Sequence, residues 1–457
     1  MTYNELKSEE NKYVMNTYGR FPIALDHGEG ATLWDVEGKK YIDLASGIGV
    51  NCLGYANPAI IDAIDKQAHK LMHVSNLFTT EPMVQVAKKL VEKTHLGGKV
   101  FFANSGAEAN EGAIKLARKY SFDKYGEGRY KVLTLINSFH GRTVTTLKAT
   151  GQERFHNYFF PFTEGFDYAV ANDIKSVRAK ADDMTCAIMM ELIQGEGGVL
   201  PLDREFVKEV EKLCREKDML LIIDEVQTGI GRTGSLFAFQ QYDIKPDVVT
   251  MAKGLGGGMP IGAVMAADTC CNVLTPGTHA TTFGGTPIVC SAANVVLDTV
   301  GDGQFLMKVR EKGEYLRNGI LSLGSPNIKG VRGMGLMLGI IVEEGKHSVF
   351  ANKLIENGVL AITAGKNASF PISALCSIAG INRLHTEAAV MMPAANPVRA
   401  RWIPVDRVCF IKNTHAAPSA VPKNGIRMPR KMSAYINTSS LSGEGSLTAI
   451  PHKDCAT

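Results

Sequence analysis

The sequence has no long apolar run, no signal-peptide core and no paired cysteine motif, and each absence excludes a class of protein. The longest apolar stretches are the length of a strand, so no segment is predicted to cross a membrane. The first residues are polar, which indicates no secretory signal, and we expect a cytoplasmic protein. The nine cysteines show no CxxC and no Cys/His cluster at zinc spacing, which favours reduced thiols and no metal site.

Aromatic residues and surplus charge are also scarce. Phe, Trp and Tyr make up 7% of the 457 residues, and the formal net charge is +4. Residues 368–457 carry a surplus of six positive charges, which leaves −2 for the first 367 residues. Because the basic segment has few aromatic side chains on which bases could stack, no nucleic-acid partner is expected. The length allows one large domain and a smaller one.

Two apolar runs of strand length end in residues that suit one cofactor. Residues 248–252 lead to Lys253 and a glycine-rich segment, and residues 219–223 lead to Asp224. A buried lysine is costly unless its pKa falls or it forms an imine, which enzymes use with carbonyl cofactors. Pyridoxal phosphate needs a lysine for its aldehyde and an acid for its pyridinium N–H. A lone lysine before glycines is more simply explained by a solvated turn. The second apolar run, which ends in Asp224, is the observation that favours a cofactor site.

Two further segments offer groups that suit a phosphate. Residues 100–103 read as a strand and are followed by Ser105, Gly106 and Ala107 at the start of a helix. Free backbone N–H groups and the positive end of the helix dipole attract anions at such a position. The hydroxyl-rich segment 279–285 could also bind a phosphate. A helix cap at Ser105 is the simpler alternative, but it does not require the two small residues that follow.

Polar residues follow the next two strand-like runs as well. Phe139 and Arg142 come after residues 132–136, and they could stack on a flat ring and receive a carboxylate. Glu191 and Glu196 come after another apolar run. Each residue alone is more often core or solvated surface. Their shared position after strand ends, where open α/β sheets bind ligands, favours one site.

Alternating strands and helices from about residue 98 to 300 predict an α/β fold. We expect a large, mostly parallel sheet with flanking helices and a smaller α+β domain. Residues 368–457 contain eight of the eighteen prolines and little periodicity, which predicts an atypical, disordered tail. The predicted parts are an N-terminal arm and hairpin of the small domain (1–57), the large cofactor-binding domain (58–300), an incomplete small domain (301–367) and the tail (368–457).

The chain from about residue 10 to 367 resembles the class III, fold-type I pyridoxal-phosphate aminotransferases. Six motifs stand in the order of that family, at 105–118, 139–143, 193–197, 224–229, 252–254 and 281–285. The resemblance implies that Lys253 holds the cofactor and moves a proton as general base and acid. It implies that Asp224 keeps the cofactor ring nitrogen protonated.

The resemblance also implies which other residues bind the cofactor. They are Ser105, Gly106, Ala107, Phe139, Glu225, Val226, Gln227 and Thr282. Thr282 would reach the phosphate of the neighbouring subunit's cofactor, which implies a homodimer with sites at the subunit interface.

The resemblance implies a reaction and a set of substrate-side residues. N-acetyl-L-ornithine would give its terminal amine to 2-oxoglutarate, leaving N-acetyl-L-glutamate 5-semialdehyde and glutamate, in arginine biosynthesis. Ornithine, succinylornithine and 4-aminobutyrate stay open as alternative amines. The implied substrate-binding residues are Arg142, Thr281, Glu191 and Glu196. The family's C-terminal carboxylate-binding arginine has no match after residue 367, so a pyridoxal-phosphate-binding protein inactivated by its altered C-terminus is a further alternative.

Overall fold

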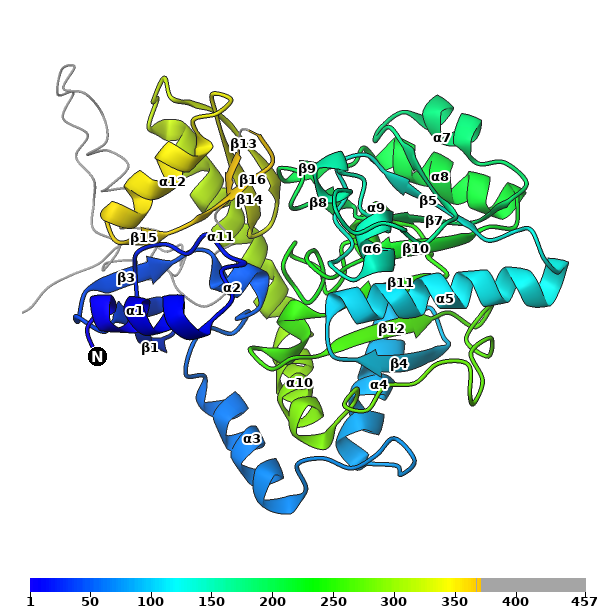
Figure 1. Cartoon of the computed structure of the whole chain (residues 1–457), viewed down its shortest axis with the longest axis horizontal. Helices are drawn as coiled ribbons and strands as arrows, with labels where there is room; N and C mark the ends of the chain where they lie inside the picture. Colours follow the sequence, from blue (N-terminus) through cyan, green and yellow to red (C-terminus); the bar gives the residue numbers. More distant parts are fainter. Residues whose placement is uncertain (367, 371–457) are drawn as a thin grey trace, which may run out of the picture. The chain divides into compact units, whose positions relative to one another are not determined.

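Figure 1 shows the structure, a computed structural model that describes residues 1–366 and 368–370. All of these residues belong to one compact unit of the chain. Apart from Ala368–Phe370, the predicted tail lies outside the described residues. No helix among the described residues combines the length and the apolar character needed to span a bilayer.

A seven-stranded sheet forms the centre of the larger part. Across the sheet the strands are β4 (Lys99–Ala103), β12 (Gly262–Ala266), β11 (Val248–Met251), β10 (Leu220–Asp224), β7 (Thr185–Met190), β5 (Lys131–Leu135) and β6 (Phe166–Ala169). Six strands are parallel and one, β12, is antiparallel to both of its neighbours. The parallel strands β7 and β10 are buried along their whole length, which is why their sequences read as continuous apolar runs.

Helices cover both faces of this sheet (Figure 1). Helix α5 (Gly106–Tyr125) packs on one face, against alternate strand residues that include Val132, Met189 and Ile222. The intervening strand residues face the other side, where they pack against other helices. The helices of that second face include α4 (Glu81–Thr94), α8 (Arg204–Glu216) and α10 (Pro287–Val300). The predicted α/β architecture is therefore confirmed.

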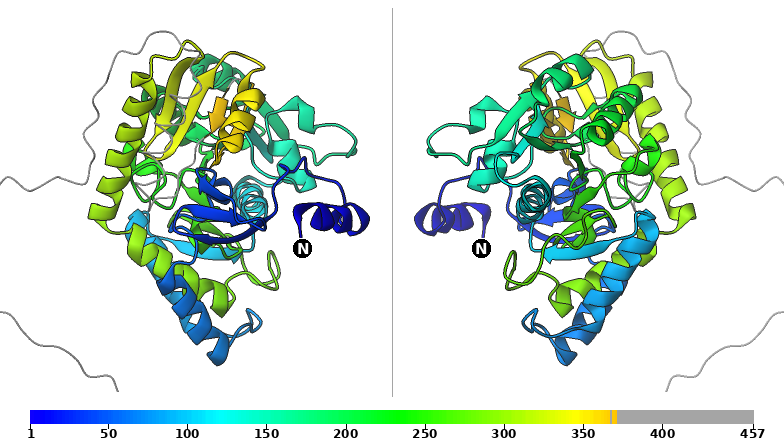
Figure 2. Two further views of the ribbon diagram at one scale, coloured as in Figure 1. Left: turned by 90° about the vertical axis from the view of Figure 1, so that its left-hand side faces the viewer. Right: turned by 90° about the vertical axis from the view of Figure 1, so that its right-hand side faces the viewer.

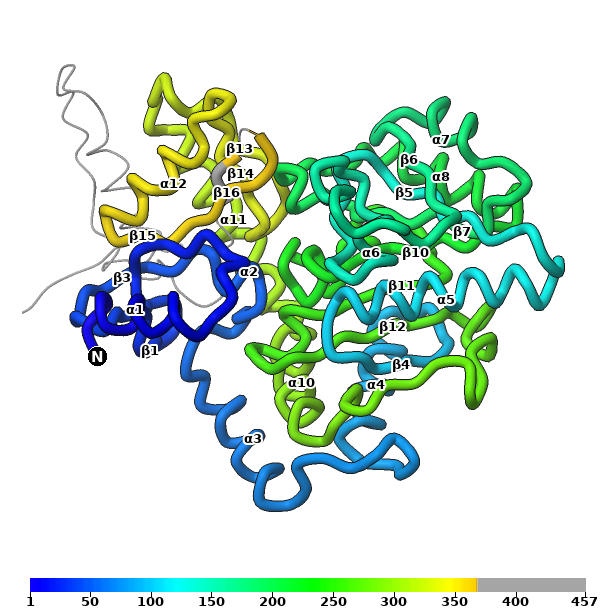
Figure 3. The backbone as a smooth tube through the Cα atoms, viewed as in Figure 1, coloured from blue at the N-terminus to red at the C-terminus, as the bar shows by residue number. Residues whose placement is uncertain are grey.

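The smaller part is built from residues near both ends of the described chain. The predicted N-terminal hairpin is present as β2 (Thr32–Asp35) and β3 (Lys40–Asp43), and β1 (Leu25–Glu29) extends it. Strand β15 (Val359–Leu360) pairs in parallel with β3, so segments more than 300 residues apart lie side by side (Figure 3). Ile42 and Leu44 share a hydrophobic core with Leu338 and Val359.

A second four-stranded sheet completes this smaller part. Its order is β13 (Ile328–Met334), β14 (Met337–Val342), β17 (Ala368–Phe370) and β16 (Ile362–Ala364). Residues of α11 (Gly303–Ser322) and α12 (His347–Glu356) pack in the core beside it. Strand β17 lies beyond residue 367, so regular pairing continues three residues into the segment predicted to be irregular.

Two N-terminal segments contain short helices. Within the predicted N-terminal arm, Tyr3–Tyr13 form helix α1, which begins with a Thr2/Glu5 capping box and has no buried residue. Figure 2 shows α1 protruding from the body of the protein. The glycine-rich segment 46–54 contains the short helix α2 (Ser46–Gly49), in which Gly47 and Ile48 have left-handed backbone angles.

Candidate active site

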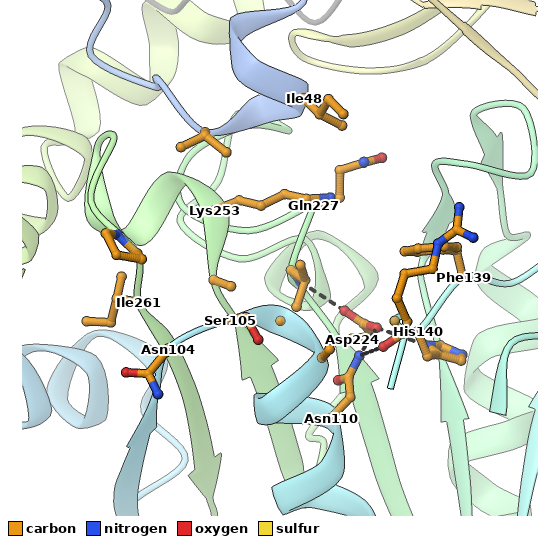
Figure 4. A pocket seen from close by; sticks show the side chains of 18 of the residues that line it. Ile48, Asn104, Ser105, Asn110, Phe139, His140, Asp224, Gln227, Lys253 and Ile261 are labelled. Carbon is orange, nitrogen blue, oxygen red and sulfur yellow. Dashed lines mark hydrogen bonds and ion pairs between the residues drawn. The ribbon is translucent and has the colours of Figure 1, made fainter. Parts of the chain in front are cut away.

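One cavity of about 590 Å³ lies at the carboxyl ends of the central strands (Figure 4). Asp224 ends β10, Lys253 follows β11, and Glu191 directly follows β7. The structure thus brings together the predicted strand-end residues. The predicted residues that line the cavity are Ser105, Gly106, Ala107, Phe139, Arg142, Glu191, Glu196, Asp224, Val226, Gln227 and Lys253.

Lys253 occupies an unusual backbone position. Its φ of 45° is left-handed, a conformation that residues other than glycine rarely adopt and that is concentrated at functional sites. Burial lowers the pKa of its ammonium group, and the nearby negative charges of Asp224, Glu191 and Glu196 act in the opposite direction. A lowered pKa makes the neutral amine, which can attack a carbonyl, easier to reach.

The Asp224 carboxylate is fixed by three hydrogen bonds. Its Oδ2 accepts from Asn110 Nδ2 and from His140 Nδ1, each at 2.8 Å, and its Oδ1 accepts from the Val226 N–H at 3.0 Å. The side chain of Asn110 also donates to the carbonyl oxygen of His140 at 2.7 Å. Three donors hold the carboxylate in one orientation, as a partner for a ring N–H requires.

Neither side-chain donor is among the residues predicted from the sequence. His140 adjoins Phe139 in the same motif, so its place in that motif is a pattern from which it could be predicted. Asn110 lies one helical turn after Gly106 on α5, inside the motif at 105–118, so it too stands in a motif of the sequence. Both are almost fully buried, and both line the cavity. The segment 258–261 and the residues Gly47, Ile48 and Val50 also line it.

The first turn of α5 forms a cradle that suits a phosphate. Ser105 caps the helix through a hydrogen bond from Glu108 N, while the N–H groups of Gly106 and Ala107 precede the first hydrogen bonds of the helix. A Cβ at Gly106 would lie 2.7 Å from Val226 Cγ1, so the close approach needs glycine. The buried Oε1 of Gln227 has no hydrogen-bond partner among the residues that the structure describes, and Gln227 lines the cavity. These features fit pyridoxal phosphate.

Phe139 lies at the cavity wall in a position fixed by Glu191. The Phe139 N–H donates to Glu191 Oε1 at 2.8 Å, and the Gly195 N–H donates to Glu191 Oε2 at 3.2 Å. Burial raises the pKa of Glu191, and the negative charge of Asp224 adds to the rise, while the interactions with His140 and with these two N–H groups act against it. Both carboxylate oxygens of Glu191 thus accept hydrogen bonds from backbone N–H groups. This favours a role in positioning the backbone over direct contact with substrate.

The outer side of the cavity carries charges of both signs. The Arg142 guanidinium lies 4.2 Å from the ring centre of Phe155 and 5.4 Å from that of Phe139. Arg154 Nη2 forms an ion pair with Glu196 Oε1 at 3.3 Å. Burial raises the pKa of Glu196, and the nearby positive groups lower it. The site therefore offers a cation for a substrate carboxylate and an anion for a substrate amine.

Three predicted residues do not line the cavity. The Glu225 side chain is buried behind it, where it accepts hydrogen bonds from Thr228 Oγ1 and Phe239 N. Adjacent residues at a strand end point in opposite directions, so Asp224 and Glu225 cannot both face the site. Thr281 accepts a hydrogen bond from the cavity residue Asn104 at 3.1 Å, and Thr282 is exposed on the surface.

The fold and the strand-end site define a pyridoxal-phosphate-dependent transferase. The family model Aminotransferase class-III matches residues 13–378, so the chain belongs to the class III aminotransferases and is an enzyme. It is 51% identical over 368 residues to the acetylornithine aminotransferase of Haemophilus ducreyi, an alignment that covers 80% of this chain and 92% of that protein.

Two more similar proteins are named for different amine substrates. The chain is 41% identical over 372 residues to the succinylornithine transaminase of Citrobacter koseri, covering 80% of this chain and 91% of that protein. The crystal structure of the ornithine aminotransferase from Toxoplasma gondii ME49 superposes with a TM-score of 0.81 and 31% identity, covering 85% of this chain and 94% of that chain. The predicted family is therefore confirmed.

Proposed function

We propose that the enzyme moves the terminal amine of N-acetyl-L-ornithine to 2-oxoglutarate, giving N-acetyl-L-glutamate 5-semialdehyde and glutamate, as a step in arginine biosynthesis. The main observation behind the proposal is that Lys253, Asp224 and Arg142 line the same cavity. The relative at 51% identity, named an acetylornithine aminotransferase, supports the choice of amine.

In this proposal the cofactor, when bound, supplies an aldehyde that exchanges amines and a ring that accepts electrons. Lys253 would bind that aldehyde through Nζ, and its neutral amine would then take and return the proton at the reacting carbon. Asp224 would hold the ring N–H, with Asn110 and His140 fixing the carboxylate. The N–H groups of Gly106 and Ala107 would bind the phosphate.

The remaining residues would orient ring and substrate. Phe139 would lie on the ring face, held by Glu191 through its backbone N–H. The unpartnered Oε1 of Gln227 would meet a polar group at the ring edge. Arg142 would bind a substrate carboxylate. Glu196 would attract the protonated amine of the donor before it reaches Lys253.

Spectroscopy of the purified enzyme with pyridoxal phosphate tests this proposal. Adding N-acetyl-L-ornithine alone should bleach the visible absorbance, and adding 2-oxoglutarate should restore it with formation of glutamate. Ornithine, succinylornithine and 4-aminobutyrate are compared in the same assay. A larger kcat/KM for any of them would replace the proposed amine, and absorbance that no amine changes would refute turnover.

We also propose that the enzyme is a cytoplasmic homodimer. Leu77, Phe78 and Phe283 are 87%, 63% and 60% exposed, more than is usual for large apolar side chains. His73 contacts the ring of Phe283, and Asn76 Nδ2 donates to the carbonyl oxygens of Thr281 and Gly284, so the two segments form one surface. This surface surrounds Thr282, which would contact the partner's cofactor.

Sedimentation of the wild-type enzyme tests the dimer. A dimer is expected, and the double variant Leu77→Lys/Phe283→Lys should sediment as a monomer, because it places charge in an apolar interface. Lys substitution at the equally exposed Tyr158 serves as the control. A wild-type enzyme that stays monomeric at micromolar concentration would refute the proposal.

A further inference from the structure

The loop of residues 195–198 lies where the cavity meets the second sheet. It connects β8 (Ile193–Gln194) to β9 (Leu200–Pro201), which pair with each other. Ile193 and Val199, at the two sides of the loop, share a hydrophobic core with Met337 and Ala364 of that sheet. The loop therefore belongs to the active-site wall and to the packing of the smaller part at the same time.

Three of the four loop residues are glycines that meet close neighbours. A Cβ at Gly195 would lie 1.6 Å from Gln227 Oε1, and one at Gly197 would lie 2.4 Å from the carbonyl oxygen of Asn137. Gly198 has a φ of 123°, and a Cβ there would lie 2.9 Å from Arg332 Nη2. The loop backbone is thus packed closely against cavity-side residues on one side and against the second sheet on the other. Glu196 lies between these glycines in the sequence.

Two hydrogen bonds from the smaller part hold this backbone. Arg332, on β13, donates from Nε to the carbonyl oxygen of Gly198 at 2.8 Å. The N–H of Gly365, which follows β16, donates to the carbonyl oxygen of Glu196 at 2.9 Å. The position of the Glu196 carboxylate at the cavity therefore depends on side-chain and backbone groups more than 130 residues away in sequence.

We propose that Arg332 is a positioning residue for amine recognition, acting through Glu196. The proposal rests on the proposed function, because it assigns Glu196 to the protonated amine of the donor. Arg332 holds the loop, the loop holds the carboxylate beside Arg154 and the cavity, and the carboxylate attracts the amine. Arg332 lies outside the cavity lining, so a direct contact with substrate is not part of this role.

Arg317 offers a matched control. Its Nη1 and Nη2 donate to the carbonyl oxygens of Val331 and Gly333, on the same strand as Arg332, at 2.8 and 2.7 Å. Arg317→Met removes these bonds and weakens the attachment of α11 to β13, while the bond from Arg332 to Gly198 remains. Arg332→Met keeps an apolar stem but removes the donor. Arg332→Lys keeps the charge and a donor.

Steady-state kinetics on the holoenzyme tests the proposal. Arg332→Met should raise the KM for the amine donor about five- to tenfold, the size of one or two lost hydrogen bonds, with little change in kcat or in cofactor affinity. Arg332→Lys should recover part of this loss. Arg317→Met should lower the melting temperature without raising that KM. Combining Arg332→Met with Glu196→Gln should add nothing to Glu196→Gln alone, because both act on one carboxylate.

Hydrogen exchange gives a readout that does not depend on turnover. The amides of the segment 193–199 should exchange faster in Arg332→Met than in wild type, and at the wild-type rate in Arg317→Met. Equal exchange and equal KM in the two Met variants, or additive effects with Glu196→Gln, would overturn the inference. If the wild-type enzyme turns over none of the amines, the proposed function fails, and faster exchange confined to Arg332→Met would still support the link from Arg332 to the loop.

Discussion

Replacing Asn110 by alanine is expected to damage the cofactor site without touching any predicted catalytic group. The Asn110 amide makes one hydrogen bond to the charged Oδ2 of Asp224 and one to the carbonyl oxygen of His140, both in the interior. Among residues 1–366 and 368–370, the substitution leaves His140 as the only side-chain donor to Asp224, and it removes the Asn110 donor from the buried carbonyl oxygen of His140.

The magnitude follows from those two bonds. A hydrogen bond to a charged acceptor contributes about 1.5–3 kcal/mol, and one between neutral groups about 1 kcal/mol. We therefore expect a loss of about 3 kcal/mol in the free energy of unfolding of the cofactor-free protein. A carboxylate that is free to turn holds the ring nitrogen less well, and affinity for pyridoxal phosphate should fall about tenfold, equivalent to about 1.4 kcal/mol.

Asn294 provides the control for this prediction. It is also a buried asparagine whose Oδ1 has no partner in the described part of the chain. Its Nδ2 donates to the carbonyl oxygen of Pro82 at 3.0 Å, on the helix side of the sheet and outside the cavity lining. Asn294→Ala should cost about 1 kcal/mol and leave cofactor affinity unchanged. Urea unfolding and titration with pyridoxal phosphate measure both quantities. Equal cofactor affinities in the two variants would refute the assigned role of Asn110.

Three further predictions concern attachment, packing and pH. Lys253→Ala should abolish the visible absorbance of the attached cofactor and the adduct fixed by borohydride, and an adduct that persists would show another attachment site. Gly262→Ala should destabilise the protein by on the order of 3 kcal/mol in urea, because its Cβ would lie 2.2 Å from Ser105 O, whereas Gly303→Ala, with open space around it, should not. Burial raises the pKa of Glu225 from 4.5 to about 7. The folded state then holds a proton that the unfolded chain releases, so stability falls as pH rises from 4.5 to 7, and Glu225→Gln should flatten this part of the profile of unfolding free energy.

Local sequence patterns were sufficient for the central sheet and the core of the site. The runs before Asp224 and Lys253 predict buried strands because parallel strands are covered on both faces and need apolar residues throughout. A polar residue at the end of such a run has to lie at the edge of the sheet, and parallel strand ends share that edge. The gathering of these residues in one cavity follows from that geometry.

Other features have weak local patterns or none. Helix α1 has no buried residue, so no apolar periodicity marks it, and the Thr2/Glu5 capping box is the local pattern that indicates its start. Glu225 belongs to the same motif as Asp224, but only the direction of the strand end decides that one carboxylate faces the cavity and the other is buried behind it. Ala368–Phe370 form a strand because β14 and β16 are in place to pair with them.

The sequence by itself determined the class of cofactor and the polar residues that meet at one cavity, since each sits in a short motif tied to a strand end. The tertiary structure alone decided how these residues are held. Asn110 meets Asp224 across 114 positions, and Arg332 reaches Gly198 across 134. Such contacts arise where separate elements pack, and the periodicity of one element carries no information about which side chain of another will lie against it.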